Sequence, residues 1–349
     1  MAATSGRATS IPFLDLSRRA AAIAPEVGEA LNRILASGVI LWGPELAGFE
    51  REWAEYTGRH HAVGVGSGTD ALRLTLTALD VGDGDEVIVP AFTAVPTLAA
   101  VAAAGATPVP VDVDPETAAL DPEAAAAAVS ERTRAAIVVH LYGRPAELPA
   151  LDVPVIEDAA HAHGALGDAG GIAAAYSFYP TKNLGGIGDG GAVVTDDDAL
   201  ADRLRRLRAH GQGPDGSFEE ISTNSRLSEI EAAALRIGLR RLEAGNRRRA
   251  EIATAYHAAA PGLRWHPHHP RHTYHLCVAR LPDREGFRAR MPCECPAHYP
   301  RTVTDEPAYA HLRRAETPAA EAWAAECVSL PCYPELSDGE VERVCAALA

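Results

Sequence analysis

Lys182 is the residue of this sequence with the clearest potential for covalent chemistry. It follows a short apolar stretch at 175–179 and precedes a glycine-rich stretch that leads into a second apolar run at 190–195. Both runs are typical of buried strands, and the glycines allow a tight backbone that leaves space beside the lysine. A lysine on such a turn suits imine formation with a carbonyl compound. A solvated lysine is the alternative that this stretch alone leaves open.

The turn Gly-Ser-Gly-Thr at 66–69 is a candidate anion site. It separates an apolar run from a helical pattern, and Ser67 and Asp70 fit a capping box. The free amides at such a helix start, together with the helix dipole, bind anions. An ordinary strand-to-helix turn is the alternative, because the stretch matches neither a Walker loop nor a dinucleotide fingerprint.

Carboxylates and histidines follow another apolar run, at 153–157. Glu157 and Asp158 end it, and His161 and His163 come next. Ligands of parallel-sheet proteins bind at the carboxyl ends of strands. A carboxylate here can therefore be functional, or it can cap the helix that follows, and either histidine can be purely structural.

Together these three sites match the needs of one cofactor, pyridoxal phosphate. That cofactor requires a lysine for a Schiff base, a carboxylate that keeps its ring nitrogen protonated, and amides and hydroxyls for its phosphate. Lys182, Asp158, the turn at 66–69 and Ser177 supply these groups, each close to the end of a predicted strand. The combination is far more specific than any of its parts.

The elements that must position these residues alternate between strands and helices, which predicts a layered α/β fold with a largely parallel sheet. After residue 195 the pattern changes to longer helices at 196–210 and 226–259, and we place a domain boundary near residue 240. The predicted strands are 62–66, 86–90, 107–111, 136–140, 153–157, 175–179 and 190–195, and the earlier predicted helices are 70–79, 97–104 and 121–129.

The composition restricts the possible partners. The chain has 349 residues, 47% of them hydrophobic, and a formal net charge of -15, which disfavours nucleic acid as a partner. We find no apolar run long enough to span a membrane and no signal-peptide pattern at the start, so we expect a cytoplasmic protein with free thiols. Cys293 and Cys295, and the histidine-rich stretch at 265–275, do not have standard zinc spacing, and we predict no metal site.

The motifs as a set resemble the DegT/DnrJ/EryC1/StrS family of nucleotide-sugar aminotransferases. The resemblance runs over almost the whole chain and is carried by PFLDL at 12–16, SGTDAL, PVDVDPET, HLYG, VIEDAAHAHGA, SFYPTKNLGGIGDGGAVVT, NSRLSEIEAA, HYP and SLPCYPELSDGEVERV. It implies a fold-type I transferase with a mostly parallel seven-stranded sheet flanked by helices, spanning 1–240, and a smaller C-terminal α+β domain at 241–349. Family members with histidine in place of Lys182 are dehydratases, so the lysine favours transamination.

The resemblance also assigns roles to single residues. Lys182 would hold the cofactor and move protons, and Asp158 would pair with the ring nitrogen. His161 would contact the phenolic oxygen of the cofactor. A phosphate site would be formed by Gly68, Thr69, the amide of Asp70 and Ser177, with Asn224 from the neighbouring subunit of a homodimer. His298 and Tyr299 would contact the substrate.

The implied reaction moves an amino group from an amino acid, with glutamate the expected donor, to a ketone on a dTDP-linked deoxysugar, at C-3 rather than C-4, in deoxyaminosugar and antibiotic biosynthesis. A cyclitol aminotransferase, a non-catalytic regulatory protein that binds the cofactor and a nicotinamide oxidoreductase are the alternatives. The sequence departs from many relatives at Ala94, where an aromatic residue stacks on the cofactor ring, and Phe92 is a candidate replacement.

Overall fold

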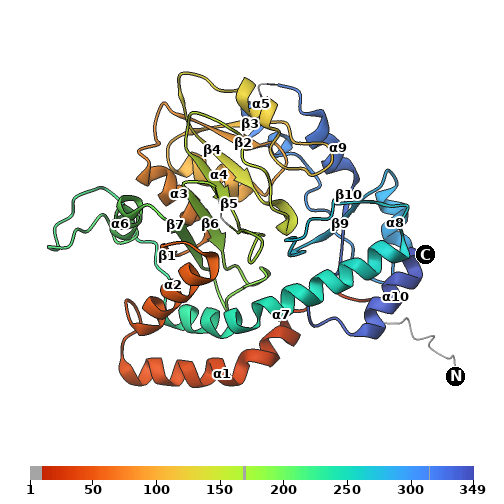
Figure 1. The fold of residues 1–349 in the computed structure, drawn as a ribbon, viewed down its shortest axis with the longest axis horizontal. Coiled ribbons are helices and arrows are strands. Elements are labelled where there is room, and N and C mark those ends of the chain that lie inside the picture. The colour runs from red at the N-terminus through yellow and green to blue at the C-terminus, as the bar shows by residue number, and fades with distance from the viewer. Residues whose placement is uncertain (1–9, 168–169, 314) are drawn as a thin grey trace.

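A seven-stranded sheet forms the centre of the protein, in a computed structural model that describes residues 10–167, 170–313 and 315–349 (Figure 1). Residues 1–9, where we expected no signal peptide, lie outside the described part. The strands of the sheet are β1 (His61–Val65), β2 (Glu86–Pro90), β3 (Thr107–Val111), β4 (Thr133–Val139), β5 (Val155–Asp158), β6 (Ala173–Ser177) and β7 (Gly191–Thr195).

The strand order is β1-β7-β6-β5-β4-β2-β3, and β7 runs antiparallel to both of its neighbours while the other pairings are parallel. The carboxyl ends of six strands therefore meet at one edge, where the amino end of β7 joins them. The prediction of a mostly parallel seven-stranded sheet is confirmed. The bounds predicted for β2 and β3 agree with the structure, and the others shift by one to three residues, because strand ends depend on pairing as well as on apolar runs.

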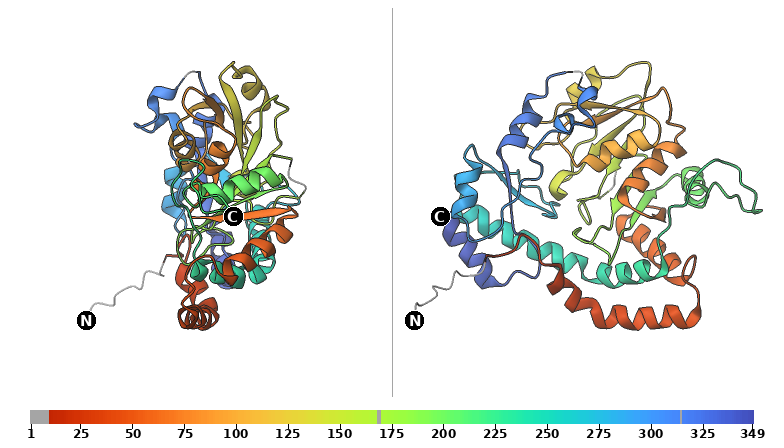
Figure 2. Two further views of the ribbon diagram at one scale, coloured as in Figure 1. Left: turned by 90° about the vertical axis from the view of Figure 1, so that its left-hand side faces the viewer. Right: turned by 180° about the vertical axis from the view of Figure 1, so that it is seen from behind.

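Helices cover both faces of this sheet. One face packs against α3, α4 and α6, and the other against α2, α5 and the first half of α7, with α1 packed on α7 (Figures 1 and 2). Their bounds are α1 (Leu16–Ser37), α2 (Pro44–Thr57), α3 (Gly68–Ala78), α4 (Val95–Ala103), α5 (Pro122–Ala127), α6 (Asp198–Leu207) and α7 (Glu229–Ala259).

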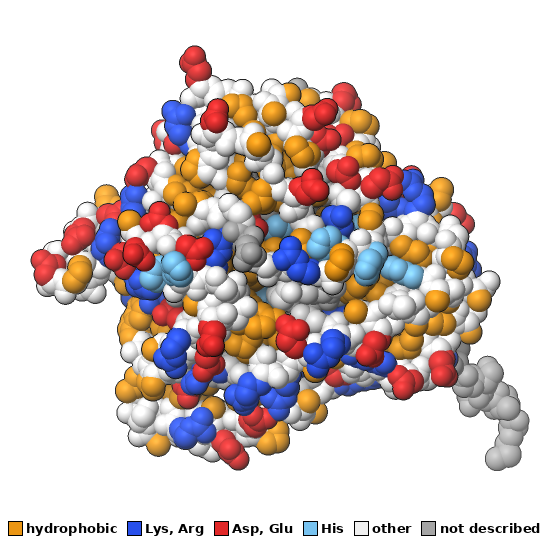
Figure 3. Space-filling view, viewed as in Figure 1, with side chains coloured by type: hydrophobic (Ala, Val, Ile, Leu, Met, Phe, Trp, Pro, Cys, Tyr) orange, Lys and Arg blue, Asp and Glu red, His pale blue; other side chains and the backbone are white. Residues whose placement is uncertain are grey.

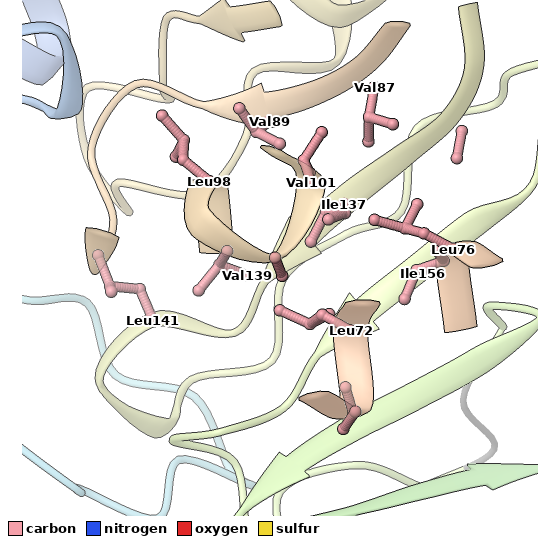
Figure 4. Close-up of a cluster of buried hydrophobic side chains, with 14 of the residues drawn as sticks. Leu72, Leu76, Val87, Val89, Leu98, Val101, Ile137, Val139, Leu141 and Ile156 are labelled. Carbon is pink, nitrogen blue, oxygen red and sulfur yellow. The ribbon is translucent and has the colours of Figure 1, made fainter. Parts of the chain in front are cut away.

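Aliphatic side chains fill the layer between the sheet and the helices α3 and α4. Figure 4 shows Val87 and Val89 of β2, Ile137 of β4 and Ile156 of β5 facing leucines of the two helices. Alternate residues of a strand point to one face, so every second side chain of these strands lies in this layer. Burial of this apolar surface drives folding and gives the edge of the sheet a rigid support.

A smaller C-terminal part packs beside the sheet. It contains a three-stranded antiparallel sheet of β8 (Arg264–Trp265), β9 (Cys277–Arg280) and β10 (Cys327–Leu330), with the helices α8 (Arg284–Arg290), α9 (Pro318–Glu326) and α10 (Asp338–Leu348). The 31-residue helix α7 runs through the expected boundary near residue 240 and connects the two parts (Figure 1). The exact boundary stays a prediction.

Three short 3-10 turns complete the described secondary structure, at Leu141–Gly143, Val303–Asp305 and Ala310–Leu312. Across the described residues we find no helix that is both long and apolar enough to traverse a lipid bilayer. The described cysteines carry free thiols, and the sulfur atoms of Cys293 and Cys295 lie 3.4 Å apart. No group of three or more potential metal ligands occurs within the described ranges.

Candidate active site

Lys182 lies where two cavities meet at the carboxyl edge of the central sheet. The smaller, of about 320 Å³, is lined by the turn before α3, by α4, and by Asp158 and Ser177. The larger, of about 550 Å³, opens between the sheet and the C-terminal part. His161, Tyr179 and Lys182 line both. One amine can therefore reach two compartments, one with a helix N-terminus and a carboxylate and one with room for a second molecule.

An arginine of α1, Arg19, stabilises the backbone of the loop that carries Lys182. Arg19 donates hydrogen bonds to the carbonyl oxygens of Pro180, Lys182 and Gly185, at 3.1, 2.9 and 2.7 Å. The Lys182 side chain itself has no hydrogen bond to the described residues. Burial lowers the pKa of this amine from 10.5 to about 8, against the opposing effect of the Asp158 charge. About a tenth of the amine is thus neutral, and therefore nucleophilic, at pH 7, compared with far less for an ordinary lysine.

Asp158 is the last residue of β5, and its carboxylate faces the smaller cavity. One oxygen accepts a hydrogen bond from the Thr97 hydroxyl at 2.8 Å, and the other accepts one from the Ala160 amide at 3.1 Å. Successive residues of a strand point to opposite faces, so Glu157 lies on the far side, bonded to His140 at 2.9 Å. A carboxylate accepts about four hydrogen bonds, and Asp158 keeps capacity for a cationic ligand in the cavity.

The N-terminus of α3 borders the same cavity. Ser67 caps the helix and accepts a hydrogen bond from the Asp70 amide at 3.1 Å. The amides of Gly68 and Thr69 have no acceptor among the described residues, and both residues line the cavity. A Cβ at Gly68 would lie 2.6 Å from the Ser177 side chain, so only glycine allows the helix start and the β6 hydroxyl to approach this closely. The arrangement suits a phosphate group.

The structure places Asp70 less favourably than its neighbours for phosphate binding. Its amide is engaged by Ser67, and its carboxylate accepts hydrogen bonds from Ser225 at 2.7 Å and Arg73 at 2.9 Å. It does not line the cavity. Ser67, which belongs to the predicted anion-binding turn at 66–69, lines the cavity.

His161 is fixed as a neutral donor. Its Nδ1 accepts the backbone amide of Tyr142 at 3.3 Å, and burial, with the charge of Lys182, holds its pKa well below 6.5. The proton is therefore on Nε2. Its ring lies against that of His275, with centroids 4.3 Å apart. A hydrogen-bond donor beside the lysine suits an oxygen on a bound aromatic ring.

His298 and Tyr299 line the larger cavity. His298 Nδ1 lies 2.8 Å from the Ser329 hydroxyl, and its backbone carbonyl accepts the Tyr142 hydroxyl. Burial lowers the pKa of His298 to about 4, so it is neutral at physiological pH. These residues come from the C-terminal part and close the cavity opposite the sheet.

Asn224 lines neither of the two cavities of its own subunit. It is exposed and pairs with Ala209 at the base of an arm, residues 209–224, that projects from the molecule beyond α6 (Figure 1). Its side chain has no hydrogen bond to the described residues. Two apolar side chains on the arm are strongly exposed, Phe218 at 69% and Ile221 at 103%.

Sequence reasoning missed Thr97 and Arg249. Thr97 sits in the first turn of α4, and only the parallel pairing of the sheet brings it to Asp158. Arg249 lies in the second half of α7 and lines the larger cavity. No local sequence signal distinguishes either residue from other helical ones.

Phe92 is not positioned to stack on a cofactor. It is fully buried, packs against Trp323 with centroids 6.1 Å apart, and does not line the smaller cavity. Ala94 does line it. Ala94 thus faces the cavity, while Phe92 belongs to the core.

Comparison with known proteins explains this constellation. A model of the DegT/DnrJ/EryC1/StrS aminotransferase family matches residues 21–349. The chain belongs to this family. A relative from Streptomyces venezuelae, dTDP-3-amino-3,4,6-trideoxy-alpha-D-glucose transaminase, is 44% identical, over 97% of this chain and 95% of its own length.

Solved structures agree with this assignment. The crystal structure of S. venezuelae DesV in complex with a ketimine intermediate is similar, with a TM-score of 0.93, 43% identity and 98% coverage of both chains. That of NtdA from Bacillus subtilis with bound cofactor PMP has a TM-score of 0.91 and 26% identity, over 99% of this chain and 86% of that one. The predictions of the family, the fold class and an aminotransferase are confirmed.

The smaller cavity fits the cofactor that the family implies. The close approach of Gly68 and Ser177 leaves unpaired amides for a phosphate, Asp158 keeps accepting capacity for a protonated ring nitrogen, and Lys182 has a lowered pKa beside them. These features concern residues of this chain alone and match the three parts of pyridoxal phosphate.

Proposed function

We propose that this protein is a pyridoxal-phosphate-dependent aminotransferase that moves an amino group from an amino acid to the ketone of a nucleotide-linked deoxysugar. The single observation that carries the proposal is the position of Lys182 between the smaller cavity, which contains the start of α3 and the Asp158 carboxylate, and the larger cavity. Pyridoxal phosphate supplies an electron sink and carries the amino group between the two substrates.

Each residue of the smaller cavity would contribute one function. Gly68, Thr69 and Ser177 hold the phosphate, and Asp158, oriented by Thr97, keeps the ring nitrogen protonated. His161 donates a hydrogen bond from Nε2 to the phenolic oxygen. Lys182 Nζ, neutral at a substantial fraction near pH 8, accepts and returns a proton at the substrate carbon.

The larger cavity would hold both substrates in turn. Its volume of about 550 Å³ is within the range of small-molecule sites, and the neutral side chains of His298 and Tyr299 can hydrogen-bond a sugar. The similarity to the Streptomyces venezuelae dTDP-3-amino-3,4,6-trideoxy-alpha-D-glucose transaminase supports a dTDP-linked sugar and amination at C-3. We infer L-glutamate as the donor, and a place in the biosynthesis of deoxyaminosugars.

We infer that the active enzyme is a homodimer in which Asn224 reaches the cofactor phosphate of the partner. The arm that begins beside Asn224 projects from the subunit and shows apolar and acidic side chains (Figure 3). Further exposed apolar side chains lie near the start of α2 and on the lysine loop, at Ile40, Leu41, Trp42, Tyr179 and Ile187. Such exposed apolar surface marks interaction sites, and twofold dimers are the commonest oligomers.

Spectroscopy followed by product analysis tests the activity. Protein loaded with pyridoxal phosphate should be yellow, change its absorbance when L-glutamate is added, and recover it when a dTDP-linked 3-keto-6-deoxysugar follows. Mass spectrometry should then show the aminated sugar. A protein that binds the cofactor but responds to no amino acid would be a regulator rather than an enzyme.

Mixing two inactive variants tests the shared site. Lys182→Ala and Asn224→Ala chains should regain activity when their subunits exchange, because one of the two sites of a mixed dimer then carries neither lesion. Absence of recovery despite demonstrated exchange would refute the shared site.

A further inference from the structure

Cys293 and Cys295 form a contacting pair of thiols in the C-terminal part. Their sulfur atoms lie 3.4 Å apart, and the Cys295 thiol also lies 3.7 Å from the backbone carbonyl oxygen of Cys293, to which it can donate. Cys327, by comparison, donates to the Tyr299 carbonyl at 3.4 Å. Two thiols in van der Waals contact need only a small movement to form a disulfide bond.

The pair borders an open pocket on the surface of the C-terminal part. This pocket has a volume of about 660 Å³ and is lined by both cysteines, by Glu294 between them and by Arg288 of α8. The two cysteines are largely buried, at 5% and 4% exposure. The pocket nevertheless gives a small molecule room to approach the thiols from outside, without passing through the cavities at Lys182.

The two thiols differ in reactivity. The hydrogen bond that Cys293 can donate lowers the pKa of Cys295, and the charge of Arg288 lowers it further, against the opposing effect of burial. The same contact, together with burial, raises the pKa of Cys293. Thiolates rather than thiols attack disulfides, so Cys295 is suited to react first and Cys293 to complete the reaction.

The segment that carries the pair also contributes to the wall of the larger cavity. Cys293 forms a parallel bridge with Ile11, and the Glu294 amide donates to the Ile11 carbonyl at 3.0 Å. The Glu294 carboxylate accepts the Phe13 amide at 3.1 Å. Phe13 and Glu294 line both the larger cavity and the pocket beside the thiols, and the Phe13 ring packs against that of His298, with centroids 5.2 Å apart.

A disulfide between residues two apart constrains the residue between them. In an extended segment such residues have their side chains on one face and their Cα atoms about 6–7 Å apart, whereas a disulfide most often joins Cα atoms about 5.5–6 Å apart. Formation of the bond would therefore bend the backbone at Glu294. Because Glu294 holds residues 11–13, this bend would move side chains on the wall of the larger cavity.

We propose that Cys293 and Cys295 are a redox-active dithiol that a small-molecule disulfide oxidises, and that this oxidation weakens binding of the nucleotide sugar in the larger cavity. The effect on binding rests on the proposed function. The free thiols of the structure are the reduced state. A thiol of lowered pKa next to a second thiol is the arrangement that redox-sensing cysteines use.

The oxidation is a thiol–disulfide exchange in two steps. The Cys295 thiolate attacks one sulfur of the small disulfide, forms a mixed disulfide with it, and releases the other half, which takes up the proton that Cys295 lost. Cys293 then gives up its proton and attacks the Cys295 sulfur, so that the intramolecular disulfide forms and the second half leaves as a thiol. Two protein thiols lose two electrons, and the small disulfide is reduced to two thiols.

Peptide mass spectrometry of the holoenzyme tests the dithiol. Trypsin cleaves after Arg290 and Arg301, so one peptide, 291–301, contains Cys293 and Cys295 and no other cysteine. After treatment with glutathione disulfide this peptide should be lighter by two hydrogen atoms and resist alkylation, and dithiothreitol should restore both thiols. Cys293→Ser should instead retain a glutathione adduct on Cys295, because it lacks the second thiol.

Kinetics of the same samples tests the effect on the cavity. We expect oxidation to raise the KM for the nucleotide sugar by about 5-fold or more, with a smaller change in kcat, and dithiothreitol to reverse the shift. Cys295→Ser should keep the KM of the reduced wild type and not respond to the oxidant. If this variant does not fold, the reversible shift in the wild type still decides.

Cys345→Ser is the matched control. Cys345 is a partly buried cysteine of α10 and does not line the pocket beside the pair. Its replacement should leave both the oxidation of peptide 291–301 and the shift in KM unchanged. Loss of the shift in this variant would assign the effect to a different thiol and contradict the proposal.

Three further results would overturn the proposal. These are a peptide 291–301 that keeps two free thiols or carries two glutathione adducts, complete formation of the disulfide with an unchanged KM, and a metal ion that the purified protein holds at the pair and that prevents oxidation. A reduced enzyme without transaminase activity would refute the proposed function instead. The peptide would still report the dithiol in that case, so the two failures are distinguishable.

Discussion

Glu157 and Asp158 are neighbours on β5, yet their surroundings differ completely. Glu157 faces away from the cavities and accepts hydrogen bonds from His140 at 2.9 Å and the Gly171 amide at 3.0 Å, with Arg59 at 3.5 Å. Asp158 faces the smaller cavity, and among the described residues its carboxylate accepts hydrogen bonds only from the Thr97 hydroxyl and the Ala160 amide. The Glu157 carboxylate is thus paired within the protein, whereas the Asp158 carboxylate can accept further hydrogen bonds from a ligand.

This difference suggests that Glu157 contributes mainly to stability and Asp158 mainly to the reaction. A buried carboxylate whose partners all belong to the protein contributes to the stability of the folded state. Its removal leaves those partners buried without a counterion or hydrogen-bond acceptor. A carboxylate with free capacity beside a lysine of lowered pKa is arranged for function instead. Variants on the two faces should therefore affect different measurements.

Lys182→Ala should have the largest effect on activity. Turnover should fall by about 10³-fold or more, because the variant loses both the covalent attachment and the proton transfer. The stability of the unloaded protein at pH 7 should be equal or higher, since folding buries an amine whose pKa is lowered to about 8.

The pH dependence of unfolding checks this sign. The unfolded lysine binds a proton up to about pH 10.5 and the folded one only up to about pH 8, so wild-type stability gains a contribution as the pH rises through this window. Urea unfolding at pH 7 and 9.5 should show that contribution in the wild type and not in Lys182→Ala. Turnover near the wild-type rate would refute the role of Lys182.

Asp158→Asn should be the next most severe. An amide cannot stabilise a protonated ring nitrogen as a carboxylate does, and we expect a loss of about 10²- to 10³-fold at saturating pyridoxal phosphate. The variant should also lower the pKa of Lys182 further, because the charge of Asp158 opposes the effect of burial. The pH profile of cofactor reconstitution in the unloaded protein measures this shift.

Near-normal turnover of Asp158→Asn at saturating cofactor would remove Asp158 from the catalytic residues. An unchanged reconstitution profile would show that its charge does not act on Lys182.

Glu157→Gln should lower the stability of the protein and leave its activity unchanged, which is the reverse of the effect expected for Asp158→Asn. Breaking a buried ion pair costs about 3–5 kcal/mol, which corresponds to a melting temperature lower by roughly 5–10 °C, while kcat at a permissive temperature should be unchanged. Burial raises the pKa of Glu157, but the hydrogen bond and charge of His140 outweigh it and hold the pKa below 4.5.

The stability that Glu157 contributes is therefore present above about pH 4.5 and lost as the pH falls through its lower folded-state pKa. The difference in melting temperature between wild type and Glu157→Gln should shrink in that acidic range. A large loss of kcat with a wild-type melting temperature would contradict the division between the two faces.

Thr97→Val should have the smallest effect. It removes the hydroxyl that orients one oxygen of Asp158 at 2.8 Å and keeps the shape of the side chain. Loss of one hydrogen bond to a charged group is worth about 1.5–3 kcal/mol, so we expect turnover to fall roughly 10-fold, with Thr97→Ser, which keeps the hydroxyl, close to wild type. Equal losses in both variants would indicate a packing role.

The sequence by itself determined the chemistry that this chain could perform. Lys182, Asp158 and the turn at 66–69 each have a local signal, and the apolar runs between them located all seven strands of the sheet. Gly68 at a helix start and Lys182 between two strands can be recognised from a short stretch of sequence, because each depends mainly on its neighbours along the chain.

Only the tertiary structure decided which groups act together. Glu157 and Asp158 have the same signal in the sequence, and the pleat of β5 assigns them to opposite faces. Thr97 and Arg249 come from helices distant from Lys182 along the chain, and their positions at the two cavities arise from strand pairing and from the packing of α7 across both parts of the molecule. Non-local contacts of this kind leave no periodic or spacing signal, because the positions along the chain that meet are set by the whole fold.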